Sequence, residues 1–100
     1  MQTTRLKLVT IIAEAVLEDR LLRELKSLGA RGYTMGEVRG EGTRGIHASD
    51  WEGQNLRIET LVSPEVAERI MAHVAQHYFP DFAVIIYSVD AEVVRGPKYL

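Results

Sequence analysis

The sequence predicts one α+β domain, 1–100, in which a β-sheet carries two helices. Three observations support this prediction: two amphipathic segments with helical spacing, four segments rich in β-branched residues, and the order in which they alternate. The chain has 100 residues, which is the length of one domain. Hydrophobic residues make up 46% and charged residues 26%, which is typical of a globular protein.

The first part of the chain is predicted to contain a strand, a helix and a second strand. The run Arg5–Ala13 is apolar and β-branched, which predicts a strand. Leucines then recur at i, i+4, i+8 and i+11 within Glu14–Leu28, with the charged residues outside that stripe, which predicts an amphipathic helix. Gly29 stands where a C-cap glycine belongs, and Gly32–Gly40 is predicted as the second strand.

The second part is predicted to repeat the succession of strand, helix and strand. A strand is predicted over Asn55–Val62. Ser63 offers an N-cap oxygen and Pro64 suits the first helical position, so a helix is predicted from there to about Tyr78. A last strand is predicted over 82–94, with a candidate break near residue 90.

The order of elements is therefore βαββαβ. Residues 6–12 also resemble residues 56–62, and a helix follows each run, which is expected of two βαβ halves. Strand-like runs also look alike by chance, so the fold prediction depends on the element order. The predicted fold is a ferredoxin-like βαββαβ sandwich, in which two helices cover one face of an antiparallel sheet.

The apolar pattern also predicts a homo-oligomer. The last strand is apolar on both sides, with Phe82, Val84 and Ile86 on one side and Ala83, Ile85, Tyr87 and Val89 on the other. Two helices can cover only one face of the sheet. We therefore expect a second subunit to cover the other face.

Several classes of function are excluded or disfavoured by composition. A formal net charge of −2 argues against a nucleic-acid-binding face. The absence of cysteine excludes disulfides, thiolate nucleophiles and cysteine metal sites. No signal-peptide pattern and no apolar run long enough to span a bilayer is found, so a cytoplasmic location is expected. No Ser/His/Asp set or carboxylate pair indicates an enzyme.

The segment 41–54 is predicted to be a long mobile loop, because it holds four charged residues, three glycines and no apolar period. At its start, glycines on either side of Thr43 would let backbone N–H groups approach an anion, and Arg44 could donate two hydrogen bonds to a phosphate. Arg95 and Lys98, in the segment 95–100, add two cations. A flexible turn and a solvated tail are the alternatives.

Three histidines are candidate metal ligands. His47 lies among acidic residues of the predicted loop, but without regular ligand spacing. His73 and His77 have the i, i+4 spacing of a zinc pair, but no third ligand is evident from the sequence. We predict no metal site and expect both helical histidines to be solvated.

Taken together, these segments resemble the PII signalling proteins. The run 28–42 is similar to the family pattern G-x-x-G-M-T-x-x-E-V-K-G-x-G. The predicted loop follows it where the family has its T-loop, and residues 56–65 resemble the third strand and the start of the second helix. This resemblance covers most of the chain and implies the same fold.

Departures from the family pattern indicate a subgroup. Arg44 stands where nitrogen-sensing members have a glutamine that helps to hold magnesium and 2-oxoglutarate, and residues 41–55 lack the tyrosine that is uridylylated. Gly29–Thr34 and Gly40–Arg44 instead resemble the SbtB and carboxysome-associated PII-like (CPII) proteins. His47 stands where the SbtB pattern has an arginine, and the cysteine-bearing redox loop of some members is lacking.

The resemblance implies a homotrimeric signal-transduction protein, not an enzyme, that binds AMP or ADP in clefts between subunits. Cyclic AMP, ATP and bicarbonate are further candidate ligands. The implied nucleotide-binding residues are Thr34, Gly40, Gly42, Thr43, Arg44, Glu59, Leu61, Ala83, Arg95 and Lys98. The implied partner-binding residues of the T-loop are His47, Ser49 and Trp51. Adenine would lie between Leu61 of one chain and Ala83 of the next.

The expected role is regulation of inorganic-carbon uptake or metabolism through the T-loop, in a carboxysome-associated carbon-concentrating mechanism. A membrane bicarbonate transporter is the expected partner. Two alternatives share the fold, namely a CutA-like trimeric metal-tolerance protein and a small ferredoxin-like enzyme. An RNA-binding module would need aromatic residues on its central strands, and the first and third predicted strands have none.

Overall fold

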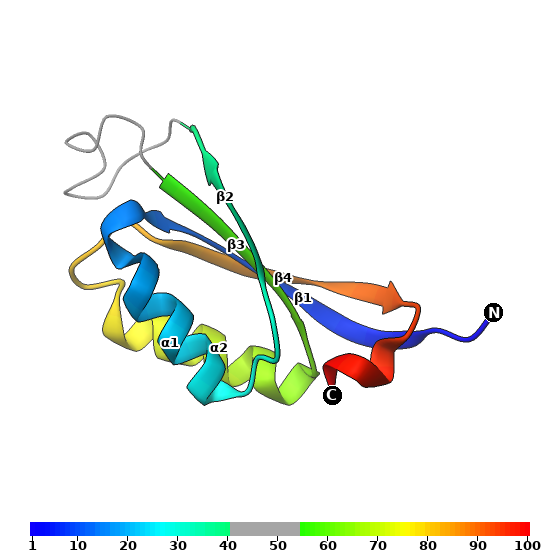
Figure 1. Cartoon of the computed structure of the whole chain (residues 1–100). Helices are drawn as coiled ribbons and strands as arrows, with labels where there is room; N and C mark the ends of the chain where they lie inside the picture. Colours follow the sequence, from blue (N-terminus) through cyan, green and yellow to red (C-terminus); the bar gives the residue numbers. More distant parts are fainter. Residues whose placement is uncertain (41–54) are drawn as a thin grey trace.

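The computed structural model describes residues 1–40 and 55–100. Figure 1 shows a twisted antiparallel sheet with two α-helices packed on one of its faces. The strands are β1 (Thr4–Glu14), β2 (Thr34–Val38), β3 (Asn55–Val62) and β4 (Ile85–Val93). The helices of the described residues are α1 (Glu18–Leu28), α2 (Pro64–His77) and the 3-10 helices η1 (Ala15–Leu17) and η3 (Gly96–Tyr99). The strand order is β2-β3-β1-β4, which confirms the predicted ferredoxin-like fold.

Element boundaries differ from the prediction at three places. Glu14 ends β1, where it is paired with Asn55 and buried, so the first helix begins only after η1. β2 and β4 are both shorter than predicted. The candidate break at Asp90 is wrong, because Asp90 stays in register with Lys7 and forms a 2.7 Å ion pair with it.

Both predicted helix ends are confirmed. Gly29 caps α1 in the left-handed conformation, with φ of 119°, which a glycine adopts without the steric cost of a Cβ. Ser63 precedes α2, and its Oγ accepts a hydrogen bond from the backbone N–H of Val66 at 3.2 Å. The start of α2 is therefore fixed by local sequence.

The core lies between the helices and the sheet. Val9, Ile11 and Ile58 project from the central strands and are fully buried. The helices contribute buried Leu21 and Ile70 to the same cluster. Burial of side chains of this size is worth roughly 1.5–3 kcal/mol each, so this layer holds the sheet and helices together.

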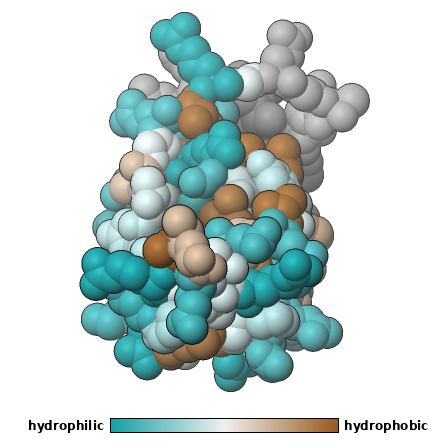
Figure 2. Space-filling model, turned by 90° about the vertical axis from the view of Figure 1, so that its right-hand side faces the viewer, coloured by the Kyte–Doolittle hydropathy of each residue, from teal (hydrophilic) through white to brown (hydrophobic). Residues whose placement is uncertain are grey.

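The opposite face of the sheet carries apolar side chains that the chain leaves exposed. Ile85, Tyr87 and Val89 are 57%, 41% and 50% exposed, whereas Phe82 and Ile86 pack against the core. The predicted two-sided apolar pattern of the last strand is confirmed. Figure 2, which views the molecule from the right-hand side of Figure 1, shows hydrophobic atoms reaching the surface among hydrophilic ones. Within the described ranges, no helix is both long and apolar enough to cross a membrane.

Candidate functional site

A cleft of about 520 Å³ lies between the middle of β1, the start of β2, the end of β3 and η3. It is open to solvent and is built from four separate segments of the chain. Its lining residues are Leu8, Arg31, Gly32, Tyr33, Thr34, Glu59, Thr60, Leu61, Lys98 and Tyr99. An apolar surface, several hydroxyls, a carboxylate and two cations therefore line the same cleft.

The apolar part of the cleft belongs to the open face of the sheet. Leu8 of β1 is paired with Leu61 of β3 in the antiparallel register. Val9, the next residue of β1, points into the core, so Leu8 points to the other face. The two leucines together offer a partly buried apolar surface of the kind on which a planar ring can lie.

Next to the two leucines, the cleft is lined by polar side chains of β2 and β3. Thr34 at the start of β2 is paired with Glu59 of β3. Arg57 lies on the same face as Glu59. Its Nε donates a 3.1 Å hydrogen bond to Oε2 of the Glu59 carboxylate, and its Nη2 forms a 2.9 Å ion pair with the same oxygen. The carboxylate accepts hydrogen bonds, and the threonine hydroxyl can both donate and accept them. This pair can therefore distinguish the polar edges of a ligand.

A hydrogen bond from Thr60 of β3 fixes the loop before β2. The Thr60 hydroxyl donates a 2.6 Å hydrogen bond to the carbonyl oxygen of Gly32 and is almost fully buried. The backbone N–H of Ala30 donates to the carbonyl of Leu25 at 3.0 Å, which joins the same loop to α1. The loop that carries three lining residues of the cleft is therefore held in place at both ends.

Cations reach the cleft from two segments. Lys98 belongs to η3, and its Nζ lies 5.8 Å from the centre of the Tyr99 ring. Arg31 lies in the loop before β2, and its Nε donates a 3.0 Å hydrogen bond to the main-chain oxygen of Leu100. Arg95 directly precedes η3 in the left-handed conformation, with φ of 66°, and does not line the cleft.

The structure brings together four of the ten sequence-predicted nucleotide-binding residues. Thr34, Glu59, Leu61 and Lys98 all line the cleft. Leu8, Arg31, Gly32, Tyr33, Thr60 and Tyr99 were not predicted. Of these six, Arg31, Gly32 and Tyr33 lie in the run 28–42 that resembles the family pattern, but that resemblance assigned them no role in the site.

Gly40 and Ala83 lie at the opposite end of the sheet. Gly40 follows the end of β2, and the backbone N–H of Ala83 donates to Oε2 of the buried Glu14 at 3.3 Å. β1 joins the two ends and has 11 residues. At ~3.3 Å per residue it is about 36 Å long. Within one chain, Gly40 and Ala83 are therefore too distant from Lys98 to share one ligand with it.

The remaining predicted residues lie outside the described residues. They are Gly42, Thr43 and Arg44 of the predicted phosphate site and His47, Ser49 and Trp51 of the predicted partner loop. Their roles stay predictions.

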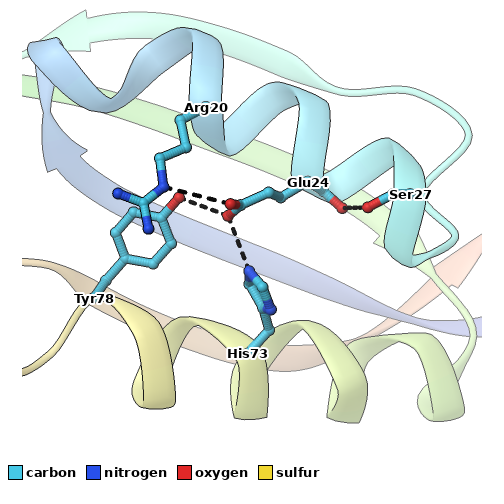
Figure 3. Close-up of polar contacts among 5 residues, drawn as sticks. All are labelled: Arg20, Glu24, Ser27, His73 and Tyr78. Carbon is cyan, nitrogen blue, oxygen red and sulfur yellow. Dashed lines mark hydrogen bonds and ion pairs between the residues drawn. The ribbon is translucent and has the colours of Figure 1, made fainter.

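A second polar cluster joins the two helices away from the cleft. In Figure 3, Arg20 and Glu24 of α1 point toward His73 of α2 and toward Tyr78. Oε1 of Glu24 accepts hydrogen bonds from the Tyr78 hydroxyl at 2.6 Å and from Nε2 of His73 at 2.9 Å. The expectation that both helical histidines are solvated is therefore wrong for His73, whose partner lies 49 residues away in the sequence.

The same contacts shift two pKa values. Burial acts to raise the pKa of Glu24, but hydrogen bonds from Tyr78 and His73, the charge of His73 and a hydrogen bond from Arg20 outweigh it, so this pKa lies below its usual range. Burial, then the hydrogen bond to Glu24 and its charge, raise the pKa of Tyr78. In the parts of the chain that the structure describes, no group of three or more acidic or histidine side chains could hold a metal ion.

Comparisons with known proteins agree with this architecture. The family model of nitrogen regulatory protein P-II matches residues 6–98. A PII-like signalling protein of Thermus thermophilus is 57% identical, with a TM-score of 0.87 and 100% of each chain covered. The CPII protein of Thiomonas intermedia K12, solved with ADP and bicarbonate, has a TM-score of 0.84 at 22% identity, over 99% of this chain and 98% of that one. A second CPII structure, with ADP, AMP and acetate, has a TM-score of 0.83 at the same identity, covering the same shares of the two chains.

Proposed function

Because this chain belongs to the nitrogen regulatory protein P-II family, we propose that it senses adenine nucleotides at clefts between its subunits. Proteins of this family are homotrimeric signalling proteins and not enzymes. The observation that carries the proposal is the cleft that combines an apolar surface with Thr34, Glu59 and Lys98. Because the chain belongs to this family, the CutA-like metal-tolerance protein and the small ferredoxin-like enzyme are no longer proposed.

The division of the predicted site between two ends of the sheet supports a site made by two chains. One half consists of Thr34, Glu59, Leu61 and Lys98, and the other includes Gly40 and Ala83. The exposed apolar face of the sheet lies between these halves and needs a partner surface. In a trimer that packs these faces together, the first half of one subunit would meet the second half of its neighbour.

Each residue type of the cleft suits one part of an adenine nucleotide. The base would lie on Leu8 and Leu61, because a planar ring gains from leaving water. The Glu59 carboxylate would accept from the exocyclic amino group, and the Thr34 hydroxyl would bond a ring nitrogen. Lys98 would bind phosphate, together with Arg95 and with Arg44 of the neighbouring chain.

AMP or ADP is the proposed ligand, with cyclic AMP and ATP as further candidates. The CPII protein, whose structures contain ADP, AMP and bicarbonate, supports this choice and makes bicarbonate a candidate second ligand. Bicarbonate would bind beside the phosphates and use the same cations.

The proposed output is regulation of inorganic-carbon uptake in the cytoplasm. Nucleotide contacts at Arg44 would change what His47, Ser49 and Trp51 present to a partner. A membrane bicarbonate transporter is the proposed partner, in a carboxysome-associated carbon-concentrating mechanism. If the parent protein pulls down the transporter and the Trp51→Ala variant does not, this output is supported. If the parent and the variant capture equal amounts of the transporter, it is contradicted.

Calorimetric titration tests the proposed ligands. AMP, ADP, ATP and cyclic AMP are each titrated with and without bicarbonate, and GDP serves as the control for the base. We expect at least one adenine nucleotide to bind with a micromolar dissociation constant, at one site per chain, and GDP to bind at least tenfold more weakly. Absence of binding by all four adenine nucleotides would refute the proposed function.

A further inference from the structure

The 3-10 helix η3 forms one wall of the cleft and is held in place by contacts with two other segments of the chain. Figure 1 shows η3 passing from the end of β4 toward the end of β3. Two of its residues, Lys98 and Tyr99, line the cleft. A four-residue helix has little stability of its own, so contacts with the rest of the chain must fix its position.

The first fastening is a close approach of Gly96 to β1. Gly96 is buried, and a Cβ added to it would lie 2.1 Å from Cβ of Thr4 and 2.4 Å from its Oγ1. Both distances are shorter than any normal van der Waals contact, and the nearer atom belongs to a short, β-branched side chain in a strand. Only glycine lets η3 approach β1 this closely.

Arg95, the residue before Gly96, has a constrained backbone conformation. Arg95 lies in the left-handed region, with φ of 66°, and its carbonyl accepts a hydrogen bond from the backbone N–H of Lys98 at 3.1 Å. The direction in which Lys98 leaves the backbone therefore depends on where Gly96 sits.

The second fastening comes from the opposite wall of the cleft. Arg31, in the loop before β2, donates its Nε hydrogen bond to the main-chain oxygen of Leu100. That loop is itself fixed by the hydrogen bond from Thr60 to Gly32. The helix η3 is thus held by Thr4 on one side and by Arg31 on the other, with Lys98 between the two fastenings.

We propose that Gly96 and Arg31 are positioning residues, which set the affinity of the cleft for phosphate-bearing ligands by holding Lys98 over it. This inference rests on the proposed nucleotide-binding function. Lysine carries a long, flexible side chain, so it loses much conformational entropy when it binds an anion. A backbone that is already fixed leaves only the side chain to be ordered, and preorganisation of this kind raises affinity.

The test is a double-mutant cycle on ADP affinity, measured by calorimetry. Gly96→Ala and Lys98→Ala are made singly and together, with Gly36→Ala as the matched control because an added Cβ there meets nothing within 4 Å. Each of the first two changes is expected to weaken ADP binding on the order of tenfold, the loss of one charge-assisted contact. The dissociation constant of the double variant for ADP is expected to be at most about twice that of either single variant, because the two residues act through one contact.

Further readouts distinguish positioning from general damage. Adenosine affinity is expected to change by less than about twofold in all variants, because the lost contact is to phosphate. The salt dependence of ADP binding is expected to fall in Gly96→Ala, as in Lys98→Ala. Arg31→Met removes the second fastening without adding a clash, so it tests the inference even if Gly96→Ala folds poorly. Its effect is likewise expected to vanish in the Lys98→Ala background.

Three outcomes would overturn the inference. They are ADP affinity unchanged in both Gly96→Ala and Arg31→Met, losses that multiply with that of Lys98→Ala, and equal losses for adenosine. A parent protein that binds no adenine nucleotide would instead refute the proposed function.

Discussion

Tyr78→Phe isolates the hydrogen bond at the centre of the cluster between α1 and α2. Tyr78 is completely buried, and its hydroxyl donates to Glu24 at 2.6 Å. The substitution keeps the ring and opens no cavity. A hydrogen bond to a charged group is worth about 1.5–3 kcal/mol. Glu24 is partly exposed and keeps His73 and Arg20 as partners, so we expect a loss at the low end, about 1.5 kcal/mol.

The loss is expected to depend on pH. The pKa of Glu24 is lower in the folded protein than its ordinary value of 4.5. Its stabilising contribution is therefore present above that ordinary value and is lost as the pH falls through the folded pKa. The pKa of Tyr78 is raised, so the parent should lose stability above its ordinary value of 10.0, where the unfolded phenol ionises. Tyr78→Phe should not share this alkaline loss.

Urea unfolding followed by circular dichroism measures both effects, at one fixed protein concentration because the protein is an oligomer. Tyr33→Phe, which removes an exposed hydroxyl, is the matched control and should change the unfolding free energy by less than about 0.5 kcal/mol. A loss below that limit for Tyr78→Phe at pH 7, or a loss that grows as the pH falls below the ordinary Glu24 value of 4.5, would refute the reasoning.

Three further predictions address the helix start, the open face and the phosphate site. Ser63→Ala removes the N-cap of α2 and should cost about 1 kcal/mol in urea unfolding; an unchanged midpoint would contradict it. Ile85→Asp places a charge on the exposed apolar face and should dissociate the trimer in light scattering at micromolar concentration; an intact trimer would show that this face is not the interface. Arg44→Ala and Arg95→Ala should each weaken ADP binding at least tenfold in calorimetry, and Lys98→Ala less than either arginine variant; parent-like binding by both arginine variants would place the site elsewhere.

Much of the fold could be predicted because its signals are local. Apolar, β-branched runs indicated the strands, the leucine stripe identified α1, and Ser63-Pro64 marked the start of α2. The start of α1 was not predictable in this way. Glu14 looks like a helix-starting acidic residue, but the structure pairs it with Asn55 and buries it beside Ala83, which are distant in the sequence.

The candidate site could be predicted only in part. The resemblance to a known family supplied Thr34, Glu59, Leu61 and Lys98, all of which line the cleft. Arg31 was missed because its place depends on a contact with residue 100, 69 positions away. The contact of Glu24 with His73 was missed for the same reason. Such partners meet only after the chain has folded, and no spacing along the sequence indicates them.

The central claim, a nucleotide site shared between two chains, is tested most directly by complementation. Leu61→Glu disables one half of the proposed site and Ala83→Glu the other, and each variant alone should bind no ADP in calorimetry. After the two are unfolded together, refolded and shown by native mass spectrometry to form mixed trimers, about a quarter of the sites should combine two intact halves, as random assembly of a cyclic trimer requires. The account predicts ADP binding at about that fraction of sites with the affinity of the parent. Mixed trimers that bind no ADP would contradict it.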